Sequence, residues 1–165
     1  MTPASAGPLS RWVAVHDLPS DGLDVTVEAT PEERQALARD FGIPAVHSLT
    51  ASFHLSGSQR GVEVRGGIEA ALEQTCVVTL EPFTTQLREP VEIGYAAPGT
   101  PVPDGDDPPD EIVGGRIDLG ALTTEFLALG LDPYPRKPGV DFAYRASEAE
   151  PDTPFAALGK LRGDK

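Results

Sequence analysis

The side chain best suited to nucleophilic chemistry is that of Cys76, the only cysteine in the chain. A catalytic cysteine needs a nearby base, usually a histidine, that keeps its thiol deprotonated. The sequence places none of its three histidines beside Cys76; they are His16, His47 and His54. The apolar run over residues 75–80 is predicted to be a short strand turned by Glu81-Pro82. Because free cysteines in such runs are usually buried and unreactive, we interpret Cys76 as structural, with catalysis by Cys76 as the weaker alternative.

Patterns typical of metal or phosphate sites are incomplete. His47 and His54 are seven residues apart in sequence typical of a strand, and an odd spacing predicts opposite faces. Asp104-Gly105-Asp106 resembles the start of a calcium loop, but the later ligand positions do not follow. Gly114-Gly115 lacks the strand and helix that flank a phosphate-binding loop. We therefore expect no cofactor, no metal, no small-molecule substrate and no enzymatic activity.

Two helices are predicted. Thr30 as N-cap, Pro31 at the first position and Glu33 closing a capping box predict a helix that runs to Phe41, with Leu37 and Phe41 facing the core. The second begins after Asp118 and ends near Gly130. Its apolar stripe is predicted to contain Leu119, Leu122, Phe126 and Leu129. Leu127 and Leu131 widen this stripe.

The remaining elements are predicted to be strands. Residues 11–17, 24–29 and much of 46–95 alternate between polar and apolar side chains. Gly66-Gly67 is interpreted as a β-bulge, and Pro90 restricts its strand to an edge or an irregular stretch. The expected fold class is α+β: an antiparallel meander of about five or six strands with two packed helices.

The chain is expected to form one domain over residues 1–165, because neither half could bury a core alone. Residues 98–111 contain five prolines and five acids, which predicts a solvated acidic loop. Residues 151–165 are predicted to form an amphipathic tail in which Phe155, Leu158 and Leu161 align. No apolar run could span a membrane, and no export signal is visible, so a cytoplasmic location without membrane partners is expected.

Three passages resemble one known family. Residues 71–83, 115–129 and 152–161 are similar, in that order, to the central strand pair, the Ile-Asp-Leu helix and the C-terminal Pro-Phe ending of the YceD family. This resemblance spans roughly residues 10 to 165 and implies a bacterial factor in 23S rRNA accumulation and large-subunit biogenesis. Many members carry Cys-x-x-Cys in the central turn, whereas this chain has Cys76 and Thr79, so a zinc site is not expected here.

The charge directs the choice of partner. The chain has 26 acids against 13 Lys and Arg, a net charge of −13, which opposes binding of RNA through the bulk surface. We therefore expect a non-enzymatic factor that contacts a basic ribosomal protein or pre-ribosomal particle through its acidic loop, with rRNA engaged indirectly. The loop acids are Asp104, Asp106, Asp107, Asp110 and Glu111.

Direct rRNA binding remains the alternative. The basic residues available for it are Arg136, Lys137, Lys160 and Arg162, although solvated charge is their simpler interpretation. Phe155 and Leu158 are either a partner site or, as we favour, part of the chain's own core.

Overall fold

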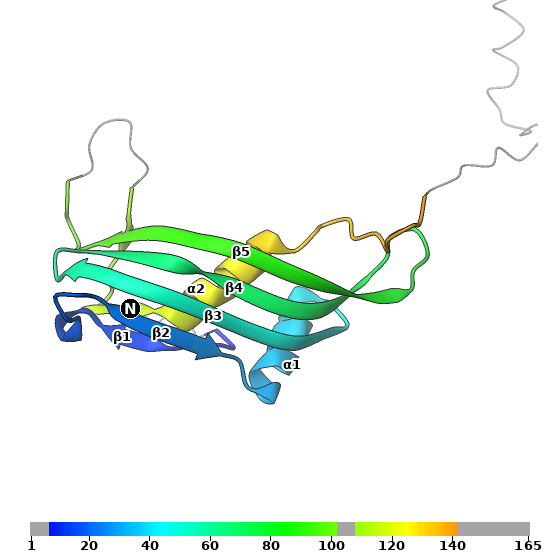
Figure 1. The fold of residues 1–165 in the computed structure, drawn as a ribbon, viewed down its shortest axis with the longest axis horizontal. Coiled ribbons are helices and arrows are strands. Elements are labelled where there is room, and N and C mark those ends of the chain that lie inside the picture. Colours follow the sequence, from blue (N-terminus) through cyan, green and yellow to red (C-terminus); the bar gives the residue numbers. More distant parts are fainter. Residues whose placement is uncertain (1–6, 102–107, 142–165) are drawn as a thin grey trace, which may run out of the picture.

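The computed structural model describes residues 7–101 and 108–141 (Figure 1). The elements in chain order are β1 (Trp12–Ala14), the short 3-10 helix η1 (Val15–Asp17), β2 (Leu23–Glu28), α1 (Pro31–Phe41), β3 (Ala45–Ser58), β4 (Gly61–Thr75), β5 (Pro82–Ala96), β6 (Asp110–Glu111), β7 (Arg116–Asp118) and α2 (Leu119–Gly130).

Most strands form one sheet in the order β2-β3-β4-β5-β6, and β1 pairs with β7 in a separate two-stranded sheet. All pairings are antiparallel except that of β5 with β6. The long strands β3, β4 and β5 contain 14, 15 and 15 residues. The predicted α+β class and the meander are therefore confirmed.

The large sheet has one covered face and one open face. Alternate residues are buried along most of β3 and β4, as in the run from Leu49 to Leu55. Leu37 of α1 and Leu122 of α2 belong to the same core cluster as these strand residues. Figure 1 shows α2 lying obliquely across the sheet and α1 near the end where β3 begins. Because the helices share one core, the opposite face of the sheet is left to solvent.

Helix α1 is confirmed by its local geometry. The Thr30 hydroxyl accepts a hydrogen bond from the Glu33 N–H at 3.3 Å, and the Glu33 carboxylate accepts one from the Thr30 N–H at 2.8 Å. Gly42 ends the helix in the left-handed region at φ 63°. Leu37 is buried and Phe41 packs against the core.

Helix α2 also begins where predicted, but its apolar stripe is shifted. Asp118 accepts from the N–H groups of Gly120 and Ala121. Leu127 is fully buried, whereas Leu129 is 72% exposed. The prediction that Leu129 faces the core is wrong, because the buried side of the helix runs through Leu119, Thr123 and Leu127. At about 100° per residue, Leu129 is turned away from that side.

Residues 75–80 do not form the predicted strand. Strand β4 ends at Thr75, and Cys76 begins a turn closed by hydrogen bonds from the Leu80 N–H to the Cys76 carbonyl and from the Cys76 N–H to the Glu81 carbonyl. Leu80 takes φ 59°, the only positive φ among described non-glycine residues. Only Cys76 is buried in this turn, and Val77 and Leu80 are exposed, so the apolar composition does not mark a core strand here.

The predicted bulge at Gly66-Gly67 is also wrong. Both glycines pair in continuous register with β3 and β5, and the register shift lies instead between Val46 and Ser48. A Cβ on Gly66 would overlap the Ser52 carbonyl oxygen. Glycine therefore allows the backbones to approach closely here.

Two predicted segments have different boundaries. Within residues 11–17 only Trp12–Ala14 is strand, and Val15–Asp17 is a 3-10 turn. The predicted loop over residues 98–111 ends in the short strand β6. In the middle of this loop, residues 102–107 lie outside the described structure.

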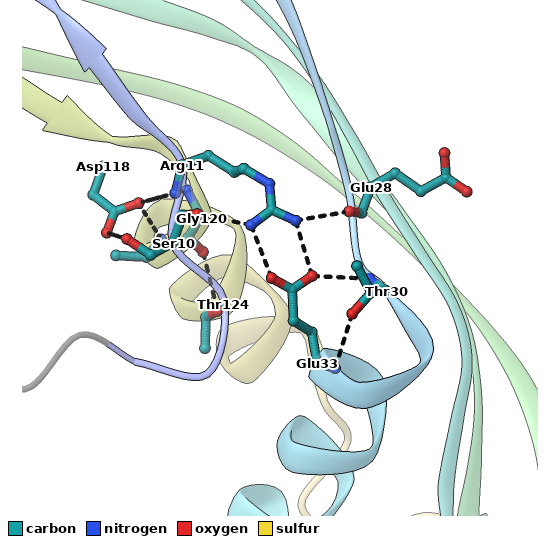
Figure 2. A network of polar contacts seen from close by, with 9 residues as sticks. Ser10, Arg11, Glu28, Thr30, Glu33, Asp118, Gly120 and Thr124 are labelled. Carbon is teal, nitrogen blue, oxygen red and sulfur yellow. Dashed lines mark hydrogen bonds and ion pairs between the residues drawn. The ribbon is translucent and has the colours of Figure 1, made fainter.

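A polar network joins the N-terminal segment to both helices (Figure 2). The Arg11 guanidinium donates to both carboxylate oxygens of Glu33 at 2.8 and 2.9 Å. Asp118 accepts from the Arg11 N–H at 2.7 Å and from the Ser10 hydroxyl at 2.6 Å. A Cβ on Gly120 would lie 2.6 Å from the Ser10 Cα, so glycine permits this close contact. The network thus links the N-terminal ends of α1 and α2 to each other through the segment that precedes β1.

Candidate interaction surface

The open face of the large sheet carries an excess of acidic side chains. Cross-strand pairing places alternate residues of β2 to β5 on this face. Its carboxylates are Asp24, Glu28, Glu63, Glu69, Glu73 and Glu92. Its arginines are Arg65 and Arg88. We call this set of residues the acidic face.

The arginines and histidines at this face are already paired with its acids. Arg65 lies 2.6 Å from Glu63 and 3.3 Å from Glu92, and Arg88 lies 3.4 Å from Glu69. His54 contacts Asp24 at 2.7 Å and His47 contacts Glu73 at 3.2 Å. The positive groups therefore offer little unneutralised charge to a phosphate.

The two histidines correct a sequence prediction. The expectation of opposite faces for His47 and His54 is wrong, because both hydrogen-bond carboxylates of the acidic face. The register shift between Val46 and Ser48 breaks the parity on which that expectation relied. The two rings bind different acids, so they do not form a joint metal site.

The centre of the acidic face is a shallow hollow. Ser52, Gly67 and Pro90 occupy adjacent positions across β3, β4 and β5, and their small side chains leave a depression of about 410 Å³. Glu69 and Arg88 line one side of it. None of the described residues at this face is Phe, Trp or Tyr, and such rings are what RNA-binding sheets use to stack bases.

The predicted loop acids are only partly described. Asp110 and Glu111 are exposed and lie in β6, beside Tyr95 and Ala96 of β5. Burial, followed by the charge of Asp110, raises the pKa of the Tyr95 phenol above its ordinary value. Asp104, Asp106 and Asp107 lie outside the described residues. The structure thus places two of the five loop acids at the end of β5.

The predicted basic residues do not form a patch within the described structure. Arg136 and Lys137 are exposed and follow α2. The Lys137 ammonium lies 3.3 Å from the Glu81 carboxylate, which partly neutralises the charge of Lys137. Lys160 and Arg162 lie outside the described residues, as do Phe155 and Leu158.

Cys76 is fully buried, as predicted, but its environment is polar. The Lys137 N–H donates to Sγ at 3.4 Å. This hydrogen bond first, and then those from Thr79, lower the pKa of the thiol to about 6. Each of the three histidines contacts a carboxylate instead, and none has a described contact with Cys76. Although the lowered pKa favours the thiolate, burial denies the sulfur the access that nucleophilic catalysis requires.

Sites of other kinds are not formed by residues 7–101 and 108–141. Within these ranges no group of three or more His, Cys, Asp or Glu side chains could hold a metal ion. Neither described helix has the length and hydrophobicity needed to cross a bilayer.

Comparison with known proteins settles the family. The model of the family described as large ribosomal RNA subunit accumulation protein YceD matches residues 64–162, more than half of the chain. The chain belongs to the YceD family. The match covers β4, β5 and α2, and so confirms the resemblance seen in the sequence. The family description associates the chain with accumulation of the large ribosomal RNA.

Searches of curated proteins and of solved structures found no match. The YceD match includes the acidic-face residues of β5 and those of β4 from Arg65 onward, whereas Glu63, β2 and β3 precede it. Sequence reasoning missed this face. Its signal was present, because the acids of β4 recur at even spacings, as Glu63, Glu69 and Glu73 do.

Proposed function

We propose that this YceD-family protein supports accumulation of the large ribosomal RNA by binding a basic ribosomal component, without catalysing a reaction. One observation carries the proposal. The acidic face presents six carboxylates, and its two arginines are already paired with three of them. A cationic partner would find an excess of negative charge on this face of the sheet.

The partner chemistry follows from this charge. Ribosomal proteins that bind RNA are rich in Lys and Arg, and an acidic surface attracts them before contact. Asp110 and Glu111 add further negative charge at the end of β5. The protein would then hold a basic surface until rRNA replaces it. This route reconciles a net charge of −13 with a role in rRNA accumulation.

The test compares the acidic face, the loop and the basic residues. The face variant carries Glu28→Gln, Glu69→Gln and Glu92→Gln. The loop variant replaces the five loop acids by Asn or Gln. The basic variant replaces Arg136, Lys137, Lys160 and Arg162 by Gln. The control variant carries Asp17→Asn, Asp40→Asn and Glu125→Gln, three exposed acids that lie outside strands β2 to β5.

Association with purified ribosomal proteins and with rRNA is measured at low and high salt. We expect the face and loop variants to bind the basic protein about tenfold more slowly at low salt, with the difference disappearing as salt rises. The control variant should bind at the wild-type rate. If only the basic variant lost binding, and the ligand lost were rRNA, direct RNA contact would replace this proposal.

A further inference from the structure

A row of short side chains crosses the open face of the large sheet from β2 to β5. The strand register aligns one residue from each of the four strands in this row: Thr26, Ser52, Gly67 and Pro90. Directly paired residues point to the same face of a sheet. Because these side chains are short, the surface is hollowed along the row, and the depression of about 410 Å³ lies over its β3, β4 and β5 members. We call this row the cross-strand trough.

Rows with long charged side chains border the trough on both sides. The row two residues away in one direction contains Glu28, Thr50, Glu69 and Arg88. The row two residues away in the other direction contains Asp24, His54, Arg65 and Glu92. Carboxylates therefore stand on both borders. The two arginines are already engaged, Arg88 by Glu69 at 3.4 Å and Arg65 by Glu92 at 3.3 Å.

The β2 end of the trough is its most negative part. Asp24 and Glu28 lie on either side of Thr26, and β2 contains no Lys or Arg. Asp24 contacts the His54 ring at 2.7 Å. The Glu28 carboxylate forms no ion pair with any residue of the described ranges. A cationic group at this end would meet two carboxylates that share no arginine.

The dimensions of the trough suit an extended chain. Strands lie about 4.8 Å apart, so the row runs about 14 Å from β2 to β5. The two borders are four residues apart along each strand, or about 13 Å, and their side chains narrow this width. An α-helix is about 10–12 Å across with its side chains and would rest on the borders. An extended chain of about four residues can reach the floor and cross all four strands.

We propose that an extended Lys- or Arg-rich segment of the basic partner lies in the cross-strand trough, perpendicular to the strands. Successive side chains of an extended chain point in opposite directions, so its cationic groups reach the carboxylates of both borders. The hydroxyls of Thr26 and Ser52 are available to hydrogen-bond its backbone. This assignment rests on the proposed function and adds the conformation and the direction of the bound segment.

The β5 end limits the affinity for such a segment. Arg88 borders Pro90 there and repels a cationic side chain, although Glu69 holds it at 3.4 Å. Arg88→Gln should therefore bind a cationic segment more tightly than the wild type does. A merely non-specific attraction to the whole acidic chain would change little with one arginine.

The first test titrates octalysine, a short cationic peptide, into the isotopically labelled full chain at low salt and follows backbone amides by NMR. We expect the amides of Thr26, Ser52 and Gly67, which lie on three different strands, to shift together and to saturate at one concentration. The amides of Ala71 and Gln86, beyond one border on the same face, should shift little. Shifts that follow one strand from end to end, or that spread evenly over the face, would overturn the proposal.

The second test fills the trough without changing its charge. The filling variant carries Thr26→Ile and Ser52→Ile, since isoleucine is bulky and favours strands. The matched control carries Ser48→Ile and Gln86→Ile, at exposed positions of the same face outside the trough. Circular dichroism checks that both fold. Fluorescence anisotropy of labelled octalysine should show binding at least about tenfold weaker for the filling variant and unchanged for the control.

Failure of this proposal is distinguishable from failure of the proposed function. Suppose that the variant with Glu28, Glu69 and Glu92 changed to Gln loses octalysine binding while a folded filling variant retains it. The acidic face would then bind cations outside the trough, and only the present proposal would be wrong. If neither variant lost binding, both proposals would be wrong. A short single-stranded RNA that shifted the trough amides would also overturn both.

Discussion

Cys76 shows how a single side chain can differ from its simplest interpretation. Its thiol is buried, yet backbone and hydroxyl donors surround it and lower its pKa to about 6 from an ordinary value of 9.0. The fold therefore stabilises the thiolate form of Cys76 relative to the unfolded chain. The contribution of Cys76 to the free energy of unfolding is therefore fully present above pH 9 and is lost as the pH falls through about 6.

Cys76→Ser is predicted to remain folded, with function intact and some loss of stability. The stability difference between the wild type and this variant should grow as pH rises from about 6 toward 9. Urea unfolding at several pH values measures it. Alkylation of the folded wild type at neutral pH should be slow, because the thiol is inaccessible. A folded variant without function would instead revive the catalytic interpretation.

Glu33 provides a second pH-dependent contribution. The hydrogen bonds from Arg11 are the main cause that lowers the pKa of Glu33 from its ordinary value of 4.5. This stabilisation is fully present above the ordinary pKa and disappears as pH falls through the lowered one. Glu33→Gln should therefore destabilise the protein by about 1 kcal/mol at neutral pH and by less in acid.

Glu32→Gln is the matched control for this prediction, since Glu32 is exposed and adjacent on the same helix. Its effect at neutral pH should be within about 0.5 kcal/mol. Thermal unfolding from pH 7 to pH 3 separates the two variants. Equal pH profiles for Glu33→Gln and the wild type would show that the pair with Arg11 contributes nothing.

At the scale of elements, α2 offers a comparison along one helix. Leu127 is fully buried and Leu129 is 72% exposed. Leu127→Ala should cost about 2–5 kcal/mol because it leaves a cavity, whereas Leu129→Ala should change stability by less than about 0.5 kcal/mol. Phe126 packs against the core without full burial, so Phe126→Ala should lie between them.

Chemical denaturation of the three variants gives these differences directly. If Leu129→Ala were as destabilising as Leu127→Ala, the last turn of α2 would be covered in solution. A Leu129→Ala variant that kept its stability but lost its binding partner would show that this side chain contacts that partner.

The sequence was sufficient for elements that are defined locally. Caps at Thr30 and Asp118 depend on neighbouring residues alone, and both helices begin where these caps predict. The turn after β4 could not be predicted in this way. Its Val77 N–H donates to the Pro135 carbonyl, a partner far along the chain, and a β-branched run favours a strand when such partners are unknown.

The candidate surface was only partly predictable for a similar reason. Alternation indicates which residues share a face, but pairing across strands needs the register. The contact of Arg65 with both Glu63 and Glu92 depends on the alignment of β4 with β5. Composition alone indicated the acidic loop, whereas the acidic face of the sheet becomes evident only once the strand register is known.

At the scale of the whole molecule, the net charge of −13 should weaken the fold through repulsion among its acids. Raising NaCl from about 20 to about 200 mM should increase Tm, because the shorter Debye length screens the repulsion among the acids. The variant with Glu28, Glu69 and Glu92 changed to Gln should show a smaller increase. A Tm that fell with salt in the wild type would indicate that the ion pairs outweigh the repulsion.

The edge of β5 has a consequence for how copies of the chain meet. Among the described residues, only Tyr95 and Ala96 pair on its outer side, so most of a 15-residue strand faces solvent with its backbone available. Such edges commonly recruit a second chain and grow into intermolecular sheets. Here Pro90 lies in the middle of the strand and offers no N–H, while Arg88 and Glu92 add charge on either side. These features oppose self-association along the β5 edge while the folded protein is not yet bound to a partner.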